Sequence, residues 1–150
     1  MTKQERIDRM DTYRKQWKKR RETLFAPFPA FLFFSLLAEE IWWLWTGLMA
    51  LLAAGLIVSL WKEADVFARL SDKLEAQRAT RNVYWILIGW LALTVGSVVS
   101  YKLVAPWWVW VLLVCCAVML TLFYNRSNKS VSKDPEQPLR SELATARGIL

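Results

Sequence analysis

The sequence predicts an all-α integral membrane protein with four transmembrane helices, arranged as two consecutive helical hairpins, and a basic amphipathic cytoplasmic helix at the N-terminus. Three observations lead to this prediction. Of the 150 residues, 55% are hydrophobic, and they form long blocks instead of being spread at helical or strand spacing. The basic residues are almost confined to the segments between alternate blocks. The 10 tryptophans lie mainly near block ends, where membrane proteins place aromatic side chains.

Residues 1–23 predict the basic amphipathic helix. An apolar stripe recurs at spacings of three, three and four residues, through Ile7, Met10, Tyr13 and Trp17. Residues at this spacing share one helical face. Basic residues surround the stripe, as in helices that lie on anionic lipid. We expect lipid headgroup contact from four consecutive residues, which would serve equally well as topology anchors: Lys18, Lys19, Arg20 and Arg21.

Residues 24–60 predict the first transmembrane hairpin. Its first apolar block, residues 24–38, is short, and Pro27 and Pro29 predict a bend at its start. A signal peptide is the rival interpretation of this block. However, the preceding segment is long, and no A-x-A-like cleavage site follows. Residues 41–60 carry no charge and match the roughly 20 residues that a spanning helix requires.

Glu39 and Glu40 separate the two blocks of this hairpin. At the centre of a helix, each charge would cost about 2.5–3.5 kcal/mol, and the two together would cancel most of the insertion energy. In a turn, they leave both flanking blocks usable as helices. We therefore predict a tight extracytoplasmic turn, followed by three interfacial anchors: Trp42, Trp43 and Trp45.

Residues 61–82 predict a cytoplasmic amphipathic helix or loop, because their apolar residues again recur at helical spacing. This segment would extend the second span or pack on the N-terminal helix. Together with residues 1–23 and 126–150, it holds every Lys and Arg of the chain except Lys102. The positive-inside rule therefore places these three segments in the cytoplasm, and this requires an even number of spans.

Residues 83–125 predict the second hairpin. Uncharged blocks at 83–101 and 103–125 are each long enough to span a bilayer. Three more interfacial anchors lie near the start of the second block: Trp107, Trp108 and Trp110. The two adjacent cysteines of this block diverge by about 100° on a helix. We expect them to act as packing residues and to form neither a disulfide nor a metal site.

Related motifs suggest an internal repeat. WWLW at 42–45 and WWVW at 107–110 each begin a helix after an apolar block and a charged segment. A tandem duplication would explain this, and so would independent placement of tryptophan at an interface. RNVYW at 81–85 and PWWVW at 106–110 also resemble the small bacterial proteins built on two-helix hairpins called 2TM domains. The chain differs from that pattern because it has no histidine and its last apolar block has no glycine.

Residues 126–150 predict a flexible cytoplasmic tail. Its first part, 127–138, is polar and contains two prolines, as linkers do. Residues 139–150 predict a short helix after Pro138.

Small residues recur at packing spacings on two predicted spans. The third span has one face with Gly89, Ala92, Gly96 and Ser100. The second span has two small-xxx-small pairs, Ala50 with Ala54 and Gly55 with Ser59. Such faces let helices approach closely. They favour packing within the bundle, self-association or contact with a partner helix.

The sequence predicts no catalytic, cofactor-binding or metal-binding residue. It contains no His, no Gly-rich phosphate loop, no nucleophile elbow and no charge inside a predicted span. The tryptophans lie mainly at the ends of the apolar blocks and mark membrane depth, whereas base stacking needs rings in water interleaved with basic residues. We therefore expect no nucleic-acid partner.

We therefore expect a non-enzymatic accessory, scaffold or regulatory subunit of a bacterial-type inner membrane. Both termini would be cytoplasmic, and the partners would be anionic lipids and either further copies of the chain or another membrane protein. One alternative is an oligomeric pore-forming or membrane-permeabilising effector. Its polar stripe would have to come from six residues: Ser35, Thr46, Thr94, Ser97, Ser100 and Thr121.

A second alternative is a small four-helix transporter that uses Glu39 and Glu40. The stretch LLAEEIW resembles the first helix of small multidrug transporters, which carries a working Glu.

Overall fold

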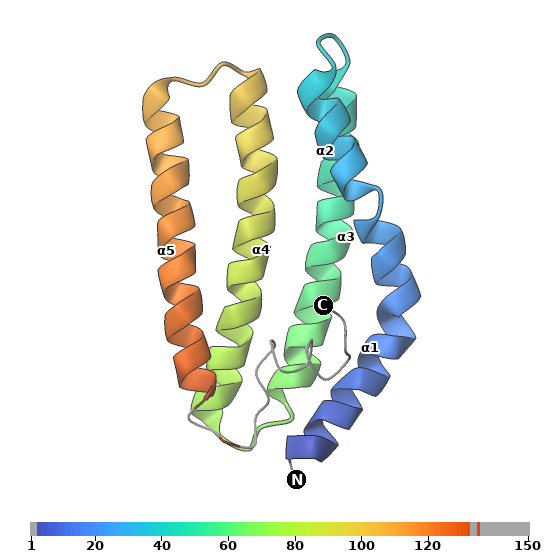
Figure 1. The fold of residues 1–150 in the computed structure, drawn as a ribbon, viewed down its shortest axis with the longest axis vertical. Coiled ribbons are helices and arrows are strands. Elements are labelled where there is room, and N and C mark those ends of the chain that lie inside the picture. Colours follow the sequence, from blue (N-terminus) through green and yellow to red (C-terminus); the bar gives the residue numbers. More distant parts are fainter. Residues whose placement is uncertain (1–2, 133–134, 136–150) are drawn as a thin grey trace.

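The computed structural model describes residues 3–132 and residue 135, and these residues form five α-helices and no strand (Figure 1). The helices are α1 (Lys3–Phe25), α2 (Phe28–Leu37), α3 (Trp42–Ala68), α4 (Leu74–Lys102) and α5 (Trp107–Val131). The predicted all-α class is confirmed. Three helices, α3, α4 and α5, are long and apolar enough to cross a membrane.

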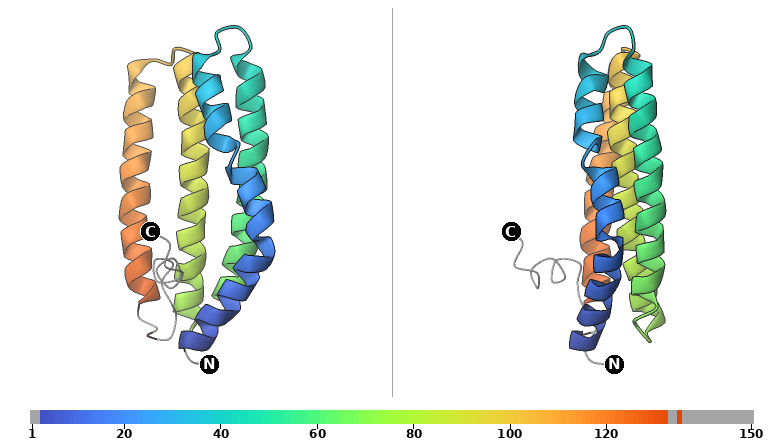
Figure 2. Two further views of the ribbon diagram at one scale, coloured as in Figure 1. Left: turned by 45° about the vertical axis from the view of Figure 1, so that its right-hand side comes forward. Right: turned by 90° about the vertical axis from the view of Figure 1, so that its right-hand side faces the viewer.

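The first apolar block is broken where its prolines predict a bend. Pro27 and Pro29 have no N–H to donate, and two residues, 26 and 27, separate α1 from α2. Helical hydrogen bonding continues on either side, from the Ala26 amide to Glu22 O at 2.9 Å and from the Phe31 amide to Pro27 O at 3.0 Å. Figure 2 shows α2 continuing α1 with a change of direction. With 10 residues, α2 rises only about 15 Å.

The two glutamates lie in a turn, as predicted. α2 ends at Leu37, and α3 begins at Trp42. Glu39 and Glu40 are exposed between them, outside any helix. The ammonium of Lys102, at the end of α4, donates a hydrogen bond of 2.7 Å to the Ala38 carbonyl beside this turn.

The basic segments gather at one end of the molecule, which we call the basic end. It comprises α1, residues 61–82 and the end of α5 from Arg126 (Figure 1). The α2–α3 turn and the α4–α5 connection lie at the opposite end. Charge is therefore segregated along the long axis of the molecule.

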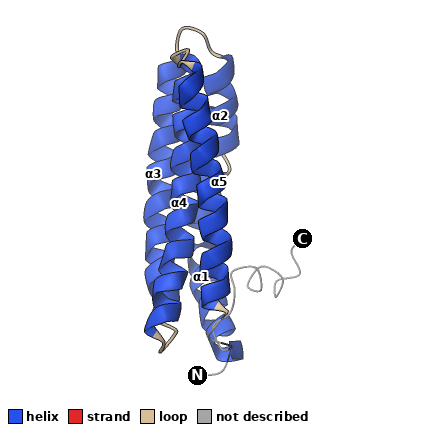
Figure 3. Cartoon of the chain, turned by 90° about the vertical axis from the view of Figure 1, so that its left-hand side faces the viewer, coloured by secondary structure: helices blue, strands red, loops and turns tan. Residues whose placement is uncertain are grey.

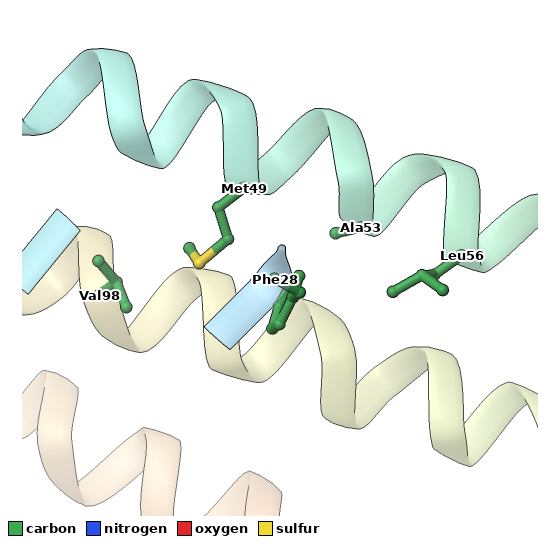
Figure 4. Packing of buried hydrophobic residues seen from close by; sticks show 5 residues of the cluster. All are labelled: Phe28, Met49, Ala53, Leu56 and Val98. Carbon is green, nitrogen blue, oxygen red and sulfur yellow. The ribbon is translucent and has the colours of Figure 1, made fainter. Parts of the chain in front are cut away.

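One apolar cluster joins α2, α3 and α4. It consists of Phe28, Met49, Ala53, Leu56 and Val98, all less than a tenth exposed (Figure 4). Phe28 from α2 and Val98 from α4 lie against α3 residues at spacings of four and three, which share one helical face. The short α2 thus packs over the pair of long helices.

Within the basic end, a second cluster joins α1 to α3 and α4. Met10 is fully buried, with Ala64, Phe67 and Tyr84. The Phe67 and Tyr84 rings meet edge to face, with centroids 6.4 Å apart. The apolar stripe of α1 therefore faces protein.

The helices do not close into a ring. α3 packs on α4, and α4 packs on α5, whereas α5 makes no helix contact with α1, α2 or α3 (Figure 1). Figure 3 shows, from the α5 side, that the described residues form helices joined by loops. None of the apolar stretch of α5 is buried within the described chain. Among the described residues, a broad apolar surface of α5 has no protein neighbour.

Two segments, 61–82 and 126–150, differ in secondary structure from the prediction. Residues 61–82 are the last turns of α3, the 69–73 connection and the first turns of α4, whereas 3–22 belong to one helix. The charged halves of the proposed repeat therefore have different structures. α5 extends to Val131, six residues into the predicted tail, and the rest of 126–150 lies outside the described residues apart from Ser132 and Pro135.

Candidate functional site

A carboxylate is buried at the basic end. Glu63 lies on α3, three residues beyond the uncharged stretch 41–60, and is 1% exposed. Its Oε1 accepts hydrogen bonds from Arg14 Nε at 2.9 Å and from the Tyr84 hydroxyl at 2.8 Å. Arg14 Nη2 lies 2.7 Å from the same oxygen, and Arg21 Nη1 pairs with Oε2. Both oxygens are therefore used, by groups from α1 and α4.

The cluster of Glu63, Arg14, Arg21 and Tyr84 carries a net positive charge. Two guanidinium groups face one carboxylate, and the side chains of Arg14 and Arg21 are only 12% and 24% exposed. Burial alone would lower the pKa of Arg14, but the Glu63 carboxylate and Tyr84 together outweigh burial and raise that pKa above its ordinary value. Arg14 is therefore held in its charged form.

The spacing of residues on α1 explains why two arginines meet one glutamate. Arg14 and Arg21 are seven residues apart, and Ile7 lies seven residues before Arg14. Seven residues are almost two helical turns, so all three lie near one face. This face of α1 thus carries an apolar side chain, Ile7, near its beginning and two arginines further along.

A second ionic group lies beside the first. Asp65 pairs with Arg81 of α4 at 2.8 Å and with Arg69 at 2.6 Å. The Asp65–Arg81 pair joins α3 to α4 at one level. Both partners are about half exposed, at 39% and 53%, so water screens this pair more than the Glu63 cluster.

These ionic groups border a groove of about 700 Å³ between α1, α3 and α4. Its charged lining includes Lys62, Asp65 and Arg81, and its aromatic lining includes Trp61 and Trp85. Both tryptophans are more than half exposed. The groove is therefore open, with charged and aromatic walls.

The structure separates the four basic residues that the sequence groups for lipid contact. Arg21 is directed to Glu63, whereas Lys18, Lys19 and Arg20 are exposed. The Arg20 guanidinium lies over the Trp17 ring, 4.8 Å from its centroid. Headgroup contact by the three exposed residues stays a prediction.

The small residues also divide into groups. A Cβ at Gly55 would lie 3.2 Å from Leu24, and one at Gly89 would lie 3.0 Å from Leu120 of α5. These glycines therefore permit close packing of α3 on the end of α1 and of α4 on α5. Apart from the adjoining backbone of α4 itself, no described atom lies within 4 Å of a Cβ at Gly96. The remaining small residues are exposed (Ala50, Ala54, Ala92) or half-buried (Ser59, Ser100).

The six tryptophans predicted as interfacial anchors lie at the opposite end, in the first turns of α3 and α5 (Figure 1). Trp42 and Trp45 are half-buried, and Trp45 stacks on Phe34 of α2 with centroids 5.0 Å apart. The other four are exposed: Trp43, Trp107, Trp108 and Trp110.

Sequence reasoning missed the Glu63 cluster, although two signals pointed to it. One is the seven-residue spacing of Arg14 and Arg21, and the other is a glutamate directly beyond an apolar block. In the described part of the chain, no three His, Cys, Asp or Glu side chains are grouped so that they could hold a metal ion.

The fold and the site define an all-helical protein with three helices apolar enough to span a membrane and a buried ionic cluster at its basic end. No family model matches the sequence, and neither curated proteins nor solved structures give a significant match.

Proposed function

We propose that the chain is a multi-pass protein of a bacterial-type inner membrane, with the basic end in the cytoplasm. α3, α4 and α5 would be complete spans. α2 and the last residues of α1 would form a short, broken first span, around which the bilayer thins. The segregation of basic residues to one end supports this orientation.

In this membrane, the chain acts as a non-enzymatic accessory, scaffold or regulatory subunit. The observation that carries this proposal is the open position of α5, which packs on α4 alone among the described helices. Its outward residues include Val111, Val114 and Val118, at spacings that share a helical face. Because no other described helix covers that face, it can receive a helix of another protein or of a second copy.

The two alternatives have less support. In a pore, hydroxyl groups would face the water-filled axis. Four of the six candidate hydroxyls instead donate to a carbonyl of their own helix: Ser35, Thr94, Ser97 and Thr121. In a transporter, a working carboxylate is partly desolvated, whereas Glu39 and Glu40 are exposed in a turn.

Purification from native membranes in a gentle detergent, followed by native mass spectrometry, tests the proposal. We expect the chain to be recovered with a stoichiometric membrane partner or as a defined oligomer. Val114→Trp with Val118→Trp should disrupt that assembly, because bulky rings on this face would block a closely packed helix. Leu51→Trp, at an exposed α3 position, is the matched control.

Three results would contradict the accessory role. One is a monomer without a partner in every preparation. Ion leakage on expression would favour the pore, and substrate flux lost in Glu39→Gln or Glu40→Gln would favour the transporter.

A further inference from the structure

The groove between α1, α3 and α4 is polarised along the axis of the molecule. α3 and α4 are antiparallel, and the Asp65–Arg81 ion pair places these two residues at one level. Trp61 and Trp85 each lie four residues further into the bundle, a rise of about 6 Å. The groove therefore has a charged end at Asp65 and Arg81 and an aromatic end at Trp61 and Trp85.

The aromatic end lies where the uncharged helical stretches begin. Residues 42–60 of α3 and 83–101 of α4 contain no charge. Trp61 adjoins the first stretch, and Trp85 and Ile88 lie within the second. In the proposed membrane, this end lies at the edge of the hydrocarbon, the depth that tryptophan favours.

The charged end carries an excess of positive charge. Lys62 and Arg81 line the groove with Asp65, and Asp65 also pairs with Arg69. Two guanidinium groups thus pair with one carboxylate, and Lys62 adds a further positive charge to the groove lining. Glu63 does not reverse the balance, because Arg14 and Arg21 already face it. The Lys62 ammonium lies 5.6 Å from the centroid of the Trp17 ring of α1.

We propose that this groove binds one anionic glycerophospholipid of the cytoplasmic leaflet. The phosphodiester lies near Lys62 and the exposed edge of Arg81, where it neutralises the excess charge by charge-assisted hydrogen bonds. An acyl chain leaves along Trp85 and Ile88 into the hydrocarbon. The negative headgroup of the lipid then faces the positive end of the groove, and its acyl chain faces the apolar end.

This inference rests on the proposed membrane location and goes beyond it. General attraction of basic residues to anionic lipid holds many lipids loosely, whereas the groove holds one lipid with α1, α3 and α4 around it. The lipid would bridge α1, through Tyr13, to the α3–α4 pair.

The test uses the full chain, delipidated in a gentle detergent. Phosphatidylglycerol and phosphatidylcholine with identical acyl chains are titrated, and native mass spectrometry counts the bound lipids. We expect one saturable phosphatidylglycerol per chain. Lys62→Gln should weaken this binding about fivefold, the contribution of one basic residue near an anionic surface.

Lys19→Gln is the matched control, because it removes an exposed cation of α1 outside the groove lining. It should leave the affinity for phosphatidylglycerol unchanged. Trp85→Ala, at the aromatic end, should weaken binding without removing a charge. Because Lys62 and Trp85 are both exposed, both variants should fold.

Equal binding of the two lipids would overturn the proposal, as would equal weakening by Lys19→Gln and Lys62→Gln. If soluble glycerol phosphate displaces phosphatidylglycerol at an equal concentration, the groove is a site for free phosphate, and the lipid proposal is wrong. Recovery of the chain in the soluble fraction without detergent would instead overturn the membrane location. The lipid titrations therefore test the binding site, and the recovery from membranes separately tests the proposed location.

Discussion

Glu63 is the residue through which α1 makes its buried ionic contact with α3. Its carboxylate is buried and accepts from arginines 49 and 42 positions earlier in the chain. Buried ion pairs contribute little net stability compared with apolar side chains, but removal of one partner leaves the other charges uncompensated. The cluster therefore selects one position of α1 on α3.

Glu63→Gln should lower the free energy of unfolding by about 3 kcal/mol, because two partly buried guanidinium groups lose their counter-charge. Unfolding in detergent with increasing dodecyl sulfate, followed by far-UV circular dichroism, measures this change. Glu40→Gln removes an exposed carboxylate in the α2–α3 turn and is the matched control, with no measurable change expected.

Replacement of all three charged residues together should not lower the free energy of unfolding. A triple variant with Arg14→Met, Arg21→Met and Glu63→Met should be as stable as the wild type or more stable. If Glu63→Gln unfolds like the wild type, the carboxylate does not hold α1. A triple variant less stable than Glu63→Gln would show that the ionic contacts themselves supply the stability.

At the scale of elements, α1 and α5 are held in different ways. α1 docks through a buried apolar stripe and an ionic cluster. α5 docks on α4 alone, where Gly89 allows Leu120 to lie close to the α4 backbone. Another glycine of α4, Gly96, faces no described atom within 4 Å of its Cβ position, apart from the adjoining backbone of α4 itself.

Two matched substitutions should therefore have unequal effects. Gly89→Leu should destabilise the α4–α5 pair by about 1–3 kcal/mol, because leucine at this position overlaps Leu120. Gly96→Leu should leave the unfolding of the monomer unchanged. Thermal unfolding in detergent measures the stability of each variant, and native mass spectrometry measures its assembly size.

Equal destabilisation by the two variants would contradict the packing of α5 at Gly89. If Gly96→Leu changes the assembly size and leaves the stability of the monomer intact, the Gly96 face contacts a second molecule.

At the scale of the whole molecule, the sequence predicts the elements better than their docking. Uncharged blocks of about 20 residues identify α3, α4 and α5, because burial of charge in a bilayer is costly. The prolines predict the break between α1 and α2, and the paired glutamates predict the turn before Trp42. These features are local, so composition over a short window reveals them.

The Glu63 cluster was not predictable in the same way. It depends on which face of α1 meets α3, and hence on contacts between residues far apart in sequence. Read locally, Arg14 and Arg21 resemble the other basic residues of α1, and Glu63 resembles one acid of a charged connection. The inward face of α3 was also not apparent, because Ala50 and Ala54 are as small as the buried Ala53 beside them.

In the proposed orientation, the basic end lies in the cytoplasm and the α2–α3 turn lies on the other side of the membrane. Labelling of single cysteines in intact cells measures this orientation. In a background with Cys115→Ala and Cys116→Ala, an impermeant thiol reagent would be applied to Glu40→Cys, Asp72→Cys and Asn128→Cys. We expect Glu40→Cys to react in intact cells and the other two to react only after the membrane is opened. Labelling of Asp72→Cys from outside, with Glu40→Cys protected, would contradict the orientation.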